Sequence, residues 1–324
     1  MSRILLQFIL LVLALAAGIA QAQTLYRLAA EATFKKTCMA PCRCPDYGEE
    51  ITVRGTFELG DAMPGDVFDF REISALYWTL SDLDNPLQTI TGSGVYKVTN
   101  FGQKPLQELQ LELSFDGGPP VHFFSDAVPL GSKGPEIDIK VSRNGFHCYD
   151  TIIRVIAAPV PPAEITPYML NDNSTFQQGC FDPCDCILEE PRPMTGGFSL
   201  VPLFLAGNWA EYAVVDLDFA APNADGDPVL TIAGSGLYTL IQGFAGPIQV
   251  MKLRLTVDDL APAFFDRELD NTMTIFPDID ITVDMSDMVC FDQILSISAS
   301  PLETSRGSGF QPRSRPEGAP TDSN

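Results

Sequence analysis

A cluster of three cysteines occurs twice in this chain, and its spacing constrains how the chain can fold. The stretch CMAPCRCP at residues 38–45 returns as CFDPCDCI at residues 180–187, and one more cysteine follows each cluster. Each cysteine of the second set lies 142 residues after its match in the first, which indicates an internal duplication. The eight cysteines are Cys38, Cys42, Cys44, Cys148, Cys180, Cys184, Cys186 and Cys290.

Other segments repeat at the same offset. ITGSGVY at 90–96 matches IAGSGLY at 232–238, and IDIKV at 137–141 matches IDITV at 279–283. Because the period is far longer than that of solenoid repeats, each copy is expected to be a complete domain. The predicted organisation is a signal peptide at 1–22, a β domain at 23–158, a proline-rich linker at 159–163, a second β domain at 164–302 and a disordered tail at 303–324.

Apolar residues alternate with polar ones inside each copy. LQLELSF at 109–115 and its partner MKLRLTV at 251–257 both have a period of two. Strands of this kind bury one face and expose the other, as antiparallel sheets do. We therefore predict an all-β fold of two tandem, homologous, disulfide-stapled antiparallel β-sandwich domains, with a small closed β-barrel as the alternative.

The first 22 residues, MSRILLQFILLVLALAAGIAQA, have the pattern of a secretory signal peptide, with Ala20-Gln21-Ala22 as the cleavage site. No later segment is apolar for long enough to suggest a membrane span after cleavage. The expected location is therefore secreted, periplasmic or at the cell surface. Cysteines in such an oxidising compartment are expected to form disulfides.

Four cysteines in each copy allow three pairings. A bond between Cys42 and Cys44 would close a small, strained ring and is the least favourable. The two other pairings bond either Cys42 or Cys44 to Cys148, and either Cys184 or Cys186 to Cys290. Each closes a loop of more than 100 residues, which stabilises a fold by up to ~4–5 kcal/mol in the chain-entropy model.

A thiolate metal site is the competing interpretation, because a C-x-C pair and His147-Cys148 resemble a ligand set. The oxidising compartment opposes it, and the spacing lacks the C-x2-C of zinc sites. In addition, Val289 replaces His147 in the second copy. Structural disulfides are therefore favoured.

The charge is acidic and unevenly distributed. The chain has 20 Lys and Arg against 42 Asp and Glu, a formal net charge of −22. Residues 23–163 carry 12 basic and 18 acidic residues, whereas residues 164–302 carry 4 and 21. Nucleic acid and anionic membranes are therefore poor partners for the second copy.

An acidic loop in the second copy, DLDFAAPNADGDP at 216–228, suggests calcium as the one cofactor. Calcium takes six to eight oxygen ligands, several of them carboxylates. The loop lacks the closing glutamate of an EF-hand, and simple solvation of the acidic residues is the alternative. The candidate ligands are Asp216, Asp218, Asn223, Asp225 and Asp227.

Signals of catalysis are few. The only histidines, His122 and His147, have Phe264 and Val289 as counterparts, and the sequence contains no nucleophile elbow, phosphate loop or H-E-x-x-H motif. The glycines of GSG at 92–94 and 234–236 lie in strand patterns, where a bulge or a close backbone approach explains them.

The sequence favours a non-catalytic binding or structural module that adheres to, or assembles on, a cell surface or extracellular polymer. The expected partners are an extracellular polysaccharide or a surface protein. One alternative is a hydrolase acting through carboxylates. Another is an inhibitor-type module that binds proteins through the loop 39–41 or 181–183. Aromatic candidates for recognition, with core packing as the competing role, are Tyr77, Trp78, Trp209 and Tyr212.

Overall fold

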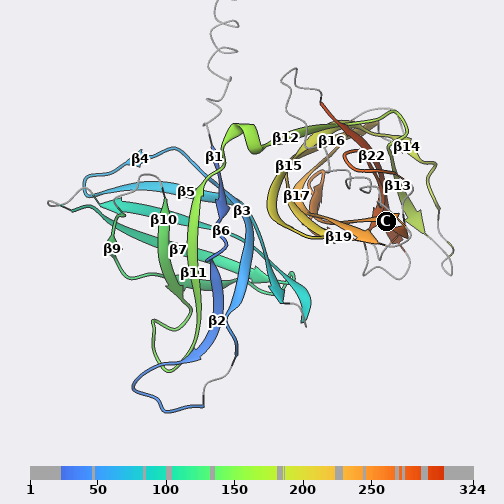
Figure 1. Ribbon diagram of the computed structural model, residues 1–324. Helices are drawn as coiled ribbons and strands as arrows, with labels where there is room; N and C mark the ends of the chain where they lie inside the picture. The colour runs from blue at the N-terminus through green and yellow to red at the C-terminus, as the bar shows by residue number, and fades with distance from the viewer. Residues whose placement is uncertain are drawn as a thin grey trace, which may run out of the picture.

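The computed structural model describes residues 23–45, 48–82, 85–99, 104–131, 136–180, 185, 187–222, 229–243, 246–266, 270–271, 274–285 and 291–302. These residues form two antiparallel sheets joined by a short 3-10 helix, η1 (Pro162–Glu164) (Figure 1). The predicted leader at 1–22 and tail at 303–324 lie outside the described residues. Within the described part there is no helix of the length and apolar character that a bilayer span requires.

The first sheet is a closed barrel. Pairings run from β3 through β5, β6, β7, β8, β10, β11 and β1 back to β3, so eight antiparallel strands complete a ring. Its strands are β1 (Thr24–Leu28), β2 (Thr33–Cys38), β3 (Ile51–Leu59), β4 (Met63–Pro64), β5 (Phe68–Asp82), β6 (Asn85–Thr99), β7 (Leu106–Phe115), β8 (Val121–Phe124), β9 (Val128–Pro129), β10 (Ile137–Ser142) and β11 (Tyr149–Pro159).

The second sheet follows the same order and returns on itself through one bridge, between Asp266 and Asp284. The corresponding closure of the first barrel is the pair Phe124 and Ser142, each 142 residues earlier. The strands of the second sheet are β12 (Thr166–Leu170), β13 (Thr175–Cys180), β14 (Arg192–Pro193), β15 (Thr195–Ala206), β16 (Trp209–Pro222), β17 (Val229–Gly243), β18 (Gly246–Val257), β19 (Ala263–Phe265), β20 (Asp270–Asn271), β21 (Ile279–Asp284) and β22 (Phe291–Pro301).

The prediction of an all-β, antiparallel, disulfide-linked fold is confirmed. The strand pairing of the first sheet is that of the closed barrel, which the sequence analysis gave as the alternative to the favoured sandwich. Each sheet encloses an apolar core of its own. Leu109, Leu111 and Leu113 of β7 are all buried, as the alternation predicts. Aromatic rings centre both cores: Phe57 meets Trp78 edge-on in the first, as Phe198 meets Phe219 in the second.

The GSG glycines lie opposite bulges, as the sequence indicated. The register of β5 against β6 shifts between Ile73 and Leu76, beside Gly92 and Gly94. A Cβ added at either glycine would overlap a backbone carbonyl oxygen of β7. The second sheet repeats the arrangement, with a bulge in β16 opposite β17. The glycines therefore allow three strands to approach closely where the barrel wall bends.

The two sheets contact each other through a small apolar cluster and a buried ion pair. Val160, Val201, Ala213 and Val215 form the cluster. Beside it, Arg54 of the first barrel donates to the buried Glu211 of the second sheet at 2.9 Å. The same guanidinium lies 4.0 Å from the ring centroid of Phe204. Removing either charge of such a buried pair leaves the other charge buried without a partner. The ion pair therefore favours one arrangement of the two sheets.

We predict that Gly94→Ala destabilises the protein by about 1–3 kcal/mol, because the new methyl group forces β6 away from the Gln110 carbonyl of β7. Gly131→Ala is the control, since no atom lies within 4 Å of the added Cβ; it should change stability by less than about 0.5 kcal/mol. Denaturant unfolding of both variants measures the difference. Equal stabilities would contradict this account of the glycine.

Candidate functional site

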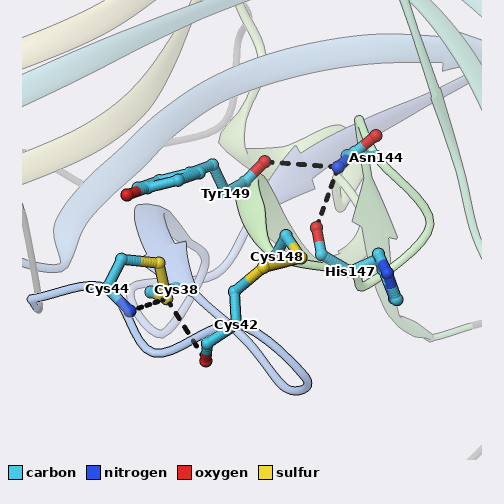
Figure 2. The surroundings of a disulfide bond; sticks show 7 residues. All are labelled: Cys38, Cys42, Cys44, Asn144, His147, Cys148 and Tyr149. Carbon is cyan, nitrogen blue, oxygen red and sulfur yellow. Dashed lines mark hydrogen bonds between the residues drawn. A yellow bond between two sulfur atoms is a disulfide. The ribbon is translucent and has the colours of Figure 1, made fainter.

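The candidate site is the end of the first barrel that is cross-linked by disulfides. It consists of residues 36–45, at the end of β2 and in the loop after it, and residues 142–151, in the hairpin between β10 and β11, which we call the clamped tip (Figure 2). Figure 1 shows it at the opposite end of the first barrel from η1. Because β11 runs for 11 residues between the two, the clamped tip lies about 30 Å from the connection to the second sheet.

Two disulfides fix the clamped tip. Cys42 is bonded to Cys148, at a sequence separation of 106 and with Cα atoms 5.0 Å apart. Cys38 is bonded to Cys44 within the loop, with Cα atoms 5.7 Å apart. The expected bond from the cluster to Cys148 is confirmed, and it is made by Cys42. It ties the loop after the second strand to the start of the barrel's last strand.

The second cysteine cluster is described only in part. Cys180 is disulfide-bonded and lies opposite Phe291 in β22, as Cys38 lies opposite Tyr149 in β11. Cys184, Cys186 and Cys290 lie outside the described residues. The bond from Cys184 or Cys186 to Cys290 therefore stays a prediction.

Hydrogen bonds hold the hairpin of the clamped tip. The Ser142 hydroxyl donates to the buried Asp150 carboxylate at 2.6 Å and accepts from the Phe146 amide at 2.8 Å. The Asn144 amide donates to the other Asp150 oxygen at 2.9 Å. The Asn144 side chain donates to the carbonyl of His147 at 2.8 Å (Figure 2). The hairpin is thus fixed from within, which lowers the entropy that a partner's binding would cost.

One face of the clamped tip continues the interior face of the barrel beyond its mouth. Phe34, Val141 and Ile153 are buried in the core. Two residues further along each strand, the same face carries Lys36, Arg143 and Thr151, because side chains alternate along a strand. Lys36 lies opposite Thr151, whose carbonyl accepts from the Arg143 amide at 3.0 Å. The three residues form one row across β2, β11 and β10.

This row is accessible. Lys36 and Arg143 are both exposed. Tyr149 follows on the same face of β11, with 61% of its surface exposed. Arg43 and His147 add exposed nitrogen groups from the loop and the hairpin. The clamped tip therefore presents cations beside an aromatic ring on a rigid support.

The corresponding face of the second sheet has different chemistry. Gln178, Gln293 and Met285 occupy the positions of Lys36, Thr151 and Arg143, judged by strand register. The Gln293 side chain, 3% exposed, donates to Gln178 at 3.3 Å, and Gln178 in turn donates to the Glu189 carboxylate at 3.2 Å. Arg192, itself buried, pairs with the Glu189 carboxylate at 3.0 Å, so this face is closed by its own hydrogen bonds and an internal ion pair.

The four aromatic candidates have different roles. Trp78, 1% exposed, packs in the core of the first barrel. Tyr77, 3% exposed, is instead buried at the contact between the sheets, where its hydroxyl donates to the Lys252 carbonyl at 3.4 Å. Tyr212 is partly buried and stacks with Phe276 at 5.6 Å between ring centroids. Trp209 is 39% exposed at the start of β16. None of the four belongs to the clamped tip.

The calcium candidates are only partly described. Asp216 has a left-handed backbone, φ 52°, at the bulge in β16, and Asp218 is exposed on the same strand. Asn223, Asp225 and Asp227 lie outside the described residues. Among the residues that are described, no group of three or more His, Cys, Asp or Glu side chains could hold a metal ion. The calcium loop therefore stays a prediction.

Asp216 instead lines a cavity of about 370 Å³ between the two sheets, together with Glu58 and Arg254. Burial raises the pKa of Asp216 above its ordinary value of 3.8. Burial and then the Asp216 charge raise the pKa of Glu58 above 4.5, against the hydrogen bond that Ser74 donates to it. Burial also lowers the pKa of Arg254. Two partly desolvated carboxylates thus face each other across the contact between the sheets.

A second depression, of about 700 Å³, lies on the outer face of the first barrel and includes Glu72, Glu112 and His122. By strand register, Ala213 and Arg254 take the places of Glu72 and Glu112 in the second sheet. The carboxylates lining the two depressions therefore have no carboxylate at the corresponding position of the other sheet.

No family model, curated protein or solved structure matches the chain. The assignment of the site consequently depends on its own geometry. The sequence analysis located the cysteine loop but missed Lys36, Arg143 and Tyr149. The signal was present, since cations break the apolar alternation at the ends of β2 and β10, but their proximity depends on a register that local sequence does not reveal.

Removing the Cys42–Cys148 bond by serine substitution of both residues should lower the free energy of unfolding by about 4–5 kcal/mol, because it frees the longer loop. The matched variant lacks Cys38–Cys44, which closes a loop of sequence separation 6; we expect about 2 kcal/mol. Denaturant unfolding of the two double variants measures both losses of stability. A larger loss from the short loop would contradict the account.

Glu58→Gln should stabilise the contact between the sheets at pH 7. A carboxyl whose pKa is raised in the folded state stabilises that state below its ordinary pKa, and this contribution is lost as the pH rises through the raised value. We expect a gain of less than about 1 kcal/mol, because half-exposed groups are screened. The gain should vanish at pH 3. Glu31→Gln, at an exposed residue, is the control; a pH-independent gain would refute the assignment.

Proposed function

We propose that this protein is an exported, non-catalytic binding module that attaches to an extracellular polymer or surface through the clamped tip. The observation that carries the proposal is the rigidity of an exposed surface: two disulfides and the Ser142–Asp150 network fix side chains that have no role in the core. Rigid scaffolds that present fixed loops are the usual basis of recognition.

Export is part of the proposal and is supported by two observations. Residues 1–22 have the composition of a secretory leader. The disulfides of the clamped tip persist best in an oxidising compartment. We further propose that the two sheets are copies of one module that has diverged, as the 142-residue offset and the shared strand order suggest.

The hydrolase alternative receives less support. A hydrolase built on the duplication requires carboxylates that recur in both copies and converge in a pocket. The depressions of the described surface instead combine Glu58 with Asp216, and Glu72 with Glu112, and these residues have no matched carboxylates in the other sheet. A mechanism based on paired carboxylates would need both groups at a fixed separation around one substrate bond.

The inhibitor-type alternative is favoured by one observation. Ala40 and Pro41 are exposed in a loop that is closed by Cys38–Cys44 and anchored by Cys42–Cys148. Protein-binding inhibitors use such preorganised loops, because little conformational entropy is lost on binding. Binding of an exported protease in place of a polymer would distinguish this function.

The test is binding of the full mature chain to an array of polysaccharides and glycans, with and without a calcium chelator. Tyr149→Ala should reduce binding at least tenfold, since a large exposed ring at a rigid site is the usual anchor of recognition. Phe291→Ala, at the corresponding position of the second sheet, should retain it. An unchanged affinity of Tyr149→Ala alongside a loss in Phe291→Ala would overturn the proposal.

A further inference from the structure

The clamped tip is a positive region in an acidic protein. The segments 36–45 and 142–151 contain Lys36, Arg43 and Arg143 in a chain of net charge −22, and their one carboxylate, Asp150, is buried and hydrogen-bonded. The corresponding segments of the second copy, 178–187 and 284–293, contain five aspartates and no lysine or arginine. The sign of the charge is therefore inverted between two ends that share a cysteine pattern and a strand order.

The two cations of the row formed by Lys36, Thr151 and Arg143 have backbones at a fixed separation. Lys36 of β2 and Arg143, directly after β10, lie on either side of Thr151 of β11. Two interstrand spacings place their backbones about 9–10 Å apart. This is comparable to the length of a disaccharide unit in an extended polysaccharide. Tyr149, which is 61% exposed, lies on the same face two residues before Thr151.

We propose that the clamped tip binds an acidic polysaccharide, a polymer of uronic acids, along the row from Lys36 to Arg143. This inference rests on the proposed function and names its ligand class. Arg143 would pair with one sugar carboxylate through two parallel hydrogen bonds, and Lys36 would pair with a carboxylate one disaccharide further on. The Tyr149 ring offers an apolar face against which the C–H face of a sugar can pack.

The acidic charge of the rest of the chain favours an acidic polysaccharide over nucleic acid as the ligand. Duplex DNA carries one negative charge per about 1.7 Å of axis, and its affinity for proteins depends on many phosphate contacts. A chain with 42 acidic residues repels so dense a charge away from the tip. A uronate polymer carries one charge per sugar, which three cations at one end can match.

Because the charge is inverted in the second copy, the chain has one such site, at the end of the first barrel. The second sheet places Gln178 and Met285 where the cations would be, and its own hydrogen bonds cover the row. An acidic polymer therefore engages the first barrel alone, and the second sheet is held away from the polymer by like charge.

The experiment measures binding of the full mature chain to polygalacturonate and to uncharged dextran of similar length. The variant combines Lys36→Gln with Arg143→Met, the residues that the second copy has at these positions. Lys140→Gln, an exposed lysine of β10 outside the clamped tip, is the control. We expect the parent and the control to bind polygalacturonate, with affinity falling steeply as salt rises, and the double variant to bind at least tenfold more weakly.

Equal binding of both polymers by the parent and the double variant would overturn the acidic ligand and leave the proposed function standing. If a folded parent chain binds neither polymer, the acidic ligand is also overturned. If the parent chain in addition binds nothing on the glycan array, the proposed attachment to a polymer is overturned too. Tighter binding of a DNA duplex than of polygalacturonate would replace the polysaccharide by nucleic acid.

Discussion

The bond between Cys42 and Cys148 is the constraint on which the candidate site depends. It joins the loop after the second strand to the start of the last strand of the first barrel, at a sequence separation of 106. The barrel brings the ends of β2 and β11 together, and the bond keeps them so beyond the point where the core can hold them. Lys36 and Arg143 are exposed on either side of the half-buried Thr151, in a register that the strand pairing sets and the disulfide reinforces.

A barrel buries the side chains that point inward. Beyond the mouth of the barrel these positions are no longer part of the core, so residues there can serve a function without destabilising the fold. Inside the barrel the row is Phe34, Ile153 and Val141, all buried. Past the mouth, the same face is open to solvent, and charged residues there cost little desolvation. The second sheet closes the equivalent face with glutamines and Glu189. One architecture thus supports two ends of opposite charge.

Much of the fold could be predicted because its signals are local. Alternation in LQLELSF gave the buried face of β7, and the GSG glycines marked the close approach of three strands. The choice between sandwich and barrel could not be predicted, because closure depends on single pairs such as Phe124 with Ser142. The site could not be assembled for a similar reason: Lys36 and Arg143 are 107 positions apart, and only the register of three strands places them in one row.

The most direct test of the account is hydrogen exchange of the full mature chain with and without polygalacturonate. Protection is expected in the segments 36–45 and 142–151 and not in 178–180 and 291–293 of the second sheet. Protection confined to the second sheet, or to the residues around the cavity between the sheets, would contradict the assignment of the clamped tip as the binding site.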